Sequence, residues 1–183
     1  MKRILKLLAL LIVLFAICTL SVKAFSVENL RGEKIAETNE VHSNFYNSKG
    51  ERVATFSLME QGYYAEDVFS FRIHVWHREG GKTKSLRLVI TPNVSAEVYL
   101  KTPDGYPWNP IKLQRSKEDL NSVVLEIPDL GFQGVGSTRL DFVVIPLKRA
   151  DAISITVKAE FELSEGIKRY KGETVLNTQL KKK

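Results

Sequence analysis

The sequence has little cysteine, little histidine and, beyond its first 24 residues, no segment with a clear helical period. Its 183 residues include 1 Cys, 3 His, 2 Met and 2 Trp. Cys18 lies in an apolar leader, so the remainder contains no disulfide, which a chain of this length does not need to form a core. The lack of amphipathic helices between apolar segments argues against a βαβ fold.

The first 24 residues have the pattern of a secretory signal peptide. A basic head with Lys2 and Arg3 precedes an apolar run, Leu7–Val22, and Ala24 is a small residue suited to cleavage. An uncleaved membrane anchor is the alternative, because a hydrophobic leader helix over residues 4–22 approaches the length that spans a bilayer. Both interpretations place the rest of the chain outside the cytoplasm, either secreted or anchored by the leader.

The positive charge of the chain is concentrated at its two ends. The net charge is +6 overall, but residues 25–163 contain 17 basic and 19 acidic side chains, a balance of −2. This charge distribution argues against nucleic acid as a partner. Residues 181–183 are three lysines, which we expect to form a disordered basic tail.

Apolar side chains alternate with polar ones in most of the chain between the leader and the tail. The alternation is clearest over Val68–Arg78 and Ile153–Leu163, where every second residue is apolar. Further predicted strands, some of them short, are Arg52–Met59, Lys84–Thr91, Ser95–Lys101, Ile111–Arg115, Val123–Ile127 and Arg139–Leu147, with a weaker one within Glu33–Asn47 and a possible edge strand at Thr174–Leu180. We expect Gln61-Gly62 to end the strand before it.

This texture predicts an all-β fold. Short strands with frequent turn signals favour an antiparallel two-sheet sandwich, immunoglobulin-like and of roughly eight strands, over a barrel that could carry an apolar ligand. The pattern over Gly62–Gly81 and Ile153–Leu163 resembles the immunoglobulin-like modules of prokaryotic surface proteins in strand texture, without a diagnostic motif. We divide the chain into a spacer at 25–32 and a single domain at 33–180.

Catalytic and metal-binding patterns are weak. The spacing of His74 and His77 puts them on opposite faces of one strand, which argues against joint chelation of a metal. The glycine-bearing segment Gly131–Ser137 precedes a strand and not a helix, so it does not match a phosphate-binding loop. Asp104, Asp129 and Asp141 lie in or beside loops and offer a weak calcium hypothesis. No cofactor is predicted.

Aromatic side chains offer the best lead to a ligand. Tyr106 and Trp108 lie in one predicted loop, and Trp76 falls on the polar face of its strand. Exposed rings can stack on sugars or anchor a protein partner, whereas the simpler alternative is that Trp108 caps one end of the core. Asn93-Val94-Ser95 is a sequon, which makes Asn93 a possible glycosylation site.

The sequence therefore predicts an exported or membrane-tethered β-sandwich without catalytic activity, with a structural or protein-interaction role at the cell surface. The alternative is a domain that binds, or less plausibly processes, carbohydrate through its loop aromatics. The expected partner is an unknown envelope protein or a polysaccharide, with the membrane as a further contact if the leader stays uncleaved.

Overall fold

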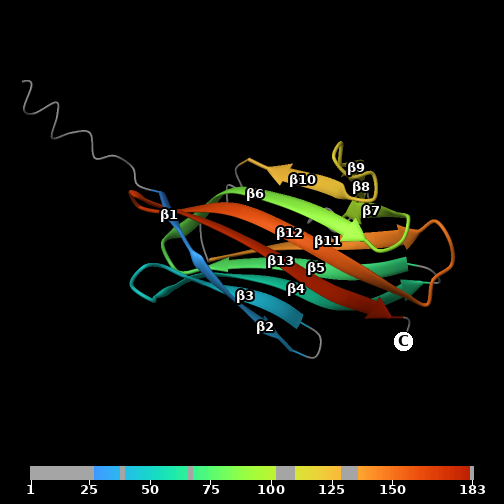
Figure 1. Cartoon of the computed structure of the whole chain (residues 1–183), viewed down its shortest axis with the longest axis horizontal. Coiled ribbons are helices and arrows are strands. Elements are labelled where there is room, and N and C mark those ends of the chain that lie inside the picture. Colours follow the sequence, from blue (N-terminus) through green and yellow to red (C-terminus); the bar gives the residue numbers. More distant parts are fainter. Residues whose placement is uncertain (1–26, 38–39, 66–67, 102–109, 129–135, 182–183) are drawn as a thin grey trace, which may run out of the picture.

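The computed structural model describes residues 27–37, 40–65, 68–101, 110–128 and 136–181, and these ranges contain thirteen strands and no helix (Figure 1). The strands are β1 (Val27–Asn29), β2 (Arg31–Ala36), β3 (Glu40–Tyr46), β4 (Arg52–Ala65), β5 (Val68–His77), β6 (Gly81–Pro92), β7 (Ala96–Leu100), β8 (Ile111–Lys112), β9 (Gln114–Arg115), β10 (Val123–Ile127), β11 (Ser137–Pro146), β12 (Ala152–Glu165) and β13 (Lys168–Lys181). The leader, residues 1–24, lies outside the described residues. No helix in the described part of the chain is long and apolar enough to cross a membrane.

The strands form two sheets that pack face to face. Sheet A has the order β1-β13-β12-β6-β10-β9, and sheet B has the order β2-β3-β4-β5-β11-β7-β8. All neighbours are antiparallel except β1 and β13, which are parallel. The predicted all-β, two-sheet architecture is confirmed, but eight strands was too low a count. The excess includes the two-residue strands β8 and β9, each too short to show a period of its own.

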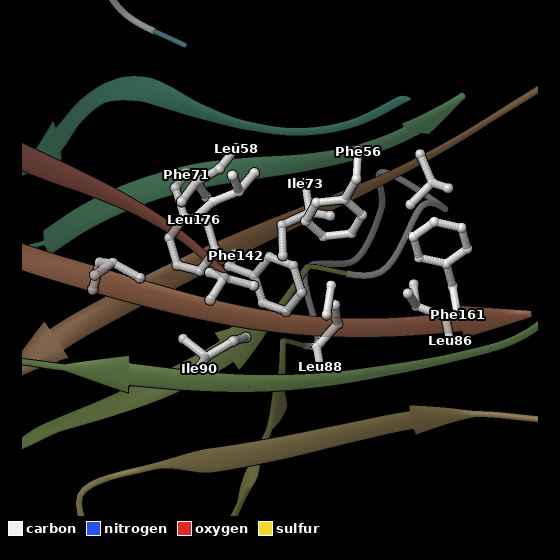
Figure 2. Close-up of a cluster of buried hydrophobic side chains, with 14 of the residues drawn as sticks. Phe56, Leu58, Phe71, Ile73, Leu86, Leu88, Ile90, Phe142, Phe161 and Leu176 are labelled. Carbon is white, nitrogen blue, oxygen red and sulfur yellow. The ribbon is translucent and has the colours of Figure 1, made fainter. Parts of the chain in front are cut away.

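Period two decides which side chains enter the core. On β5 the alternate residues Phe69, Phe71, Ile73 and Val75 are buried, as predicted. Figure 2 shows Phe71 and Ile73 in one cluster with buried residues of β6 and β12, such as Leu88 and Phe161. Phe71 stacks on Phe142 with the ring centroids 4.9 Å apart. Each fully buried large apolar side chain contributes about 1.5–3 kcal/mol, so these alternating sets supply most of the stability.

The predicted spacer at 25–32 is wrong for its described part. Val27–Asn29 pairs with β13 in sheet A, and the chain then crosses at Leu30 into sheet B, where β2 pairs with β3. Leu30 packs against the core and so holds this crossing in place. Polar residues dominate both short strands because edge strands leave much of their surface in water, which is why the sequence pattern concealed them.

The predicted break at Gln61-Gly62 is also wrong, because β4 continues to Ala65. The Ser70 hydroxyl donates to the Gln61 carbonyl over 2.6 Å, and the β4–β5 ladder shifts register between Gln61 and Ala65. A bulge or irregularity of this kind accommodates a glycine without ending the strand.

The predicted edge strand at Thr174–Leu180 is part of a strand twice as long, β13. β1 pairs only with Arg169–Lys171 of this strand, so the predicted residues do lie at an edge of the described sheet. The inward positions of β13 include Gly172, Thr174 and Thr178, and these weak apolar residues hide the alternation. Lys181, which we placed in the tail, is the last residue of β13 and pairs with Ala152. Residues 182 and 183 lie outside the described residues.

Candidate functional site

Trp76, the one described member of the predicted aromatic set, lies on the outer face of sheet B. It is half-buried between Thr55 of β4 and Ser137 of β11, and the Arg52 guanidinium lies 4.8 Å from its ring centroid. A cation over the ring occupies one of the two faces on which a sugar would stack. Tyr106 and Trp108 lie outside the described residues, so the structure does not join the three rings into a site.

Two histidines that are distant in sequence lie in one row across sheet B. His42 of β3, Ser57 of β4, His74 of β5 and Arg139 of β11 are successive register partners, and their side chains point outward. His42 Nδ1 and His74 Nε2 are buried without a hydrogen-bond partner. Burial, and then the charge of Arg139, lower the pKa of His74. The sequence patterns did not predict that His42 and His74 lie in one row with Ser57 between them, because a sequence does not reveal which strands are neighbours.

His77 lies on the inward side of β5 and is buried, so the prediction that it and His74 occupy opposite faces is confirmed. Within the described ranges, no three His, Cys, Asp or Glu side chains lie together as potential metal ligands.

The Asp141 carboxylate is held by an arginine on the neighbouring strand. Arg72 Nε donates to Asp141 Oδ1 over 2.6 Å and Nη2 donates to Oδ2 over 3.0 Å, and this bond raises the pKa of Arg72. Its partners in the calcium hypothesis, Asp104 and Asp129, lie outside the described residues.

Asn93 lies at the turn that follows β6 and is exposed. Its Oδ1 accepts a 2.8 Å hydrogen bond from the Ser154 backbone N–H, and its own backbone N–H donates to the Ser154 carbonyl over 2.9 Å. Both bonds hold the turn against β12. Glycosylation of Asn93 stays a prediction.

A groove with a volume of about 970 Å³ crosses the outer face of sheet A. It runs from Ile127 and Pro128 at the end of β10 to Asn29 and Leu30, where the chain leaves sheet A for sheet B. Between these ends the groove crosses β6, β12 and β13. These strands lie side by side in sheet A (Figure 1).

Register places the charged walls of the groove. One row consists of Glu126 of β10, Arg87 of β6, Glu160 of β12 and Glu173 of β13, each the pairing partner of the next. A second row lies on the other side of the groove floor and contains Glu162 of β12 and Lys171 of β13, which pair with each other in the register of the sheet. The lining thus contains four carboxylates and two cations, a net charge of −2.

The floor between these rows consists of backbone, because Leu86, Phe161 and Gly172 turn their side-chain positions toward the core. Gly172 lies directly beneath the Phe161 ring, and a Cβ there would overlap the ring. Phe161 in turn makes an edge-to-face contact with Phe45 of sheet B, with centroids 4.8 Å apart. The glycine therefore allows the ring to tie the two sheets together under the groove.

The groove's electrostatics leave carboxylates open to solvent. Arg87 contacts Glu126 at 3.1 Å and Glu160 at 3.6 Å, and Lys158 contacts Glu160 at 2.8 Å. The hydrogen bond from Lys158 lowers the pKa of Glu160, so this carboxyl group is ionised at neutral pH. The Glu126 side chain is 67% exposed. Arg169 contacts Glu162 at 3.3 Å. The groove lining keeps a net charge of −2, which can attract a cationic ligand.

Sequence reasoning missed the groove. Its charged residues come from four strands, and in the sequence each one reads as an ordinary solvent-facing position of a period-two pattern. Alternation identifies the wet face of a strand, but it carries no information on which wet residues of other strands become neighbours.

Several solved structures share the β-rich architecture at low similarity. The collagen-binding subdomain of the Enterococcus faecalis surface protein ACE has a TM-score of 0.47 at 7% identity, and the match covers 69% of this chain and 95% of that one. A cohesin module from a Clostridium perfringens glycoside hydrolase has a TM-score of 0.45 at 10% identity, with 68% and 93% covered. The collagen-binding domain of a Staphylococcus aureus adhesin has a TM-score of 0.40 at 10% identity, with 67% and 93% covered. With every TM-score below 0.5, these likenesses assign no function to this chain.

The sequence comparisons give a family but no activity. None of the curated proteins compared with the sequence matches it. The family model described as a domain of unknown function, DUF8121, matches residues 30–181, which is nearly the whole of the described sandwich. The chain therefore belongs to the DUF8121 family.

Proposed function

We propose that this protein is an exported or membrane-tethered, non-catalytic interaction module of the immunoglobulin-like type. It acts at the cell surface and binds an extended basic segment of an extracellular protein in the groove of sheet A. The leader pattern supports export, since a basic head followed by an apolar run is typical of secretory signals. The groove supports binding, and it is the single observation that carries the proposal.

The shape and charge of the groove both favour an extended cationic segment. It crosses the sheet from β10 to β1, and carboxylates line both of its rows. Complementary charges raise the association rate and align the ligand more than they add affinity. Peptide binding here is therefore expected to be fast, modest in affinity and sensitive to salt.

Recognition of carbohydrate is the weaker hypothesis. Trp76 lies on sheet B, on the face opposite to the groove, and its ring is covered by Arg52. Among the described residues, Phe161 is the only aromatic one that lines the groove, and it is buried. Tyr106 and Trp108 carry this hypothesis alone, and a panel of polysaccharide fragments tested against Trp108→Ala would examine it.

The test uses the full chain in detergent and a fluorescently labelled (Lys-Thr)6 peptide, with (Glu-Thr)6 as the acidic comparison. We expect anisotropy to report binding of the basic peptide only. Glu126→Gln combined with Glu162→Gln should weaken binding about three- to tenfold, because two wall charges are lost. Glu33→Gln, on the opposite sheet, is the matched control and should leave the affinity unchanged. Equal binding of both peptides, or no loss in the groove variant, would refute the proposal.

A further inference from the structure

The last strand, β13, has a long free edge. One edge of this 14-residue strand pairs with β12 along its whole length, while β1 covers only Arg169–Lys171 on the other. From Gly172 to Lys181 that second edge has no strand partner among the described residues. The other outermost strands are far shorter: β8 and β9 have two residues each, β1 has three and β2 has six.

The backbone groups that face this free edge can be assigned from one hydrogen bond. The Leu30 N–H donates to the Lys171 carbonyl over 2.8 Å, so the carbonyl of Lys171 points away from β12. Alternate residues of a strand direct their backbone groups to the same side. The N–H and C=O groups of Glu173, Val175, Asn177 and Gln179 therefore face the open edge, and the side chains of these residues are exposed.

The usual devices that protect a sheet edge are missing from this segment. Natural edge strands are kept short, or carry proline, charges or bulges that prevent pairing with another chain. Residues 174–180 contain neither proline nor charge, and their register with β12 runs without a shift. An unprotected edge of this length is suited to the addition of a strand.

The charges at the two ends of the edge are complementary to a second copy of the same strand. In an antiparallel pair of β13 with its copy centred on Asn177, Glu173 lies opposite Lys181 of the copy, and the reverse contact follows by symmetry. Moving the centre to Val175 would place Lys181 opposite Arg169, where β1 already pairs. Of the registers centred on Val175 and on Asn177, only the second joins opposite charges and leaves the residues that pair with β1 outside the contact.

We propose that the protein forms a two-fold symmetric dimer in which the free edges of β13 from two copies pair antiparallel about Asn177. Sheet A of one copy then continues into sheet A of the other. The contact uses the edge of the sheet, whereas the groove lies on its face, and Glu173 borders both. The groove variants Glu126→Gln and Glu162→Gln leave the edge-facing residues from Glu173 to Lys181 unchanged, so the two proposals are tested separately.

Cysteine cross-linking tests the register directly. In the full chain with Cys18→Ser, Asn177→Cys places two thiols opposite each other, with the Cα atoms about 5.5 Å apart and within reach of a disulfide. Val175→Cys is the matched control, because its copy lies four residues away along the strand, about 13 Å. We expect oxidation to give a dimer band on a non-reducing gel for Asn177→Cys and not for Val175→Cys. Equal cross-linking of both variants, or none for Asn177→Cys, would overturn the proposed register.

Charge reversal tests whether the occupant is a second copy. Lys181→Glu puts like charges opposite each other twice, so the dimer dissociation constant measured by sedimentation should rise at least about fivefold. Glu173→Lys combined with Lys181→Glu restores both pairs and should restore dimerisation. A leader segment or a foreign protein on this edge would leave the chain monomeric, or would give no restoration, and either result contradicts the proposal. Circular dichroism melting confirms that each variant is folded.

Discussion

The outer faces of the two sheets come from the same alternating pattern, yet they differ in how their charges are used. On sheet B, Arg72 is bound at both ends of its fork by Asp141, and Arg52 covers Trp76. On sheet A, Arg87 is shared between Glu126 and Glu160, and the face is hollowed by the groove. Sheet B thus holds the charges of Arg72 and Arg52 within the molecule, although ring nitrogens of His42 and His74 lack a hydrogen-bond partner. Sheet A presents a concave face on which Arg87 is shared between two carboxylates.

The difference follows from which residues meet across the strands. A bidentate arginine–carboxylate pair fixes both side chains and leaves little for a ligand. Single contacts to a more exposed carboxylate are individually weak in water. A polar face of a sheet is therefore a candidate binding surface when its ion pairs are held by single contacts and its shape is concave. The number of charged side chains on the face does not by itself predict binding.

The largest expected effect is at the floor of the groove. Gly172→Ala inserts a Cβ into the space of the Phe161 ring, which the edge-to-face contact with Phe45 prevents from moving freely. We expect a loss of about 1–3 kcal/mol in the free energy of unfolding, measured by urea denaturation. Glu173→Ala, the next residue along β13 with an exposed side chain, should change stability by less than about 0.5 kcal/mol. Equal stabilities of the two variants would show that the ring is not held as described.

The same substitution on each face sharpens the comparison. Arg72→Ala leaves the half-buried Asp141 carboxylate without its bidentate partner, and it should cost about 1–2 kcal/mol of unfolding free energy. Arg87→Ala removes exposed single contacts on sheet A and should cost less than about 0.5 kcal/mol. Urea denaturation at neutral pH measures both. An Arg87 effect as large as that of Arg72 would contradict the distinction between the two faces.

The smallest expected effect is a pH dependence that belongs to sheet B. Burial lowers the pKa of His74 in the folded state, and the charge of Arg139 lowers it further. Glu40 opposes this shift and Arg72 adds to it. His42 lies in the same outward row of sheet B as His74. His74 therefore binds a proton more readily in the unfolded chain than in the folded one, and its protonation favours unfolding. The stability that neutral His74 contributes is fully present above its unfolded pKa of about 6.5 and is lost as the pH falls below that value. His74→Gln should flatten the fall of the melting temperature between about pH 7 and pH 5, whereas Lys84→Gln, at a half-buried position on sheet A, should leave that slope unchanged. An unaltered slope in His74→Gln would contradict this assignment.

Part of the fold could be read directly from residues. Period two on β5 and β12 identified their buried and wet faces correctly, since side chains alternate in any extended strand whatever its neighbours. β1 was missed, and β2 and β13 were predicted only weakly and in part, because edge positions and small inward residues such as Gly172 and Thr174 weaken the apolar signal. The candidate aromatic site could be tested only at Trp76, whose contact with Arg52 depends on how β4 and β5 are aligned.

By itself, the sequence indicated an antiparallel sandwich in which each strong strand has one buried and one solvent-facing side, because local alternation is a property of consecutive residues. Only the tertiary structure decided which wet residues meet. Glu126, Arg87, Glu160 and Glu173 form one row, and His42 lies in line with His74, because strand order and register bring distant segments together. The groove and the free edge of β13 are consequences of that pairing, and the physical reason is that the burial of the apolar faces selects the register while the polar residues follow it.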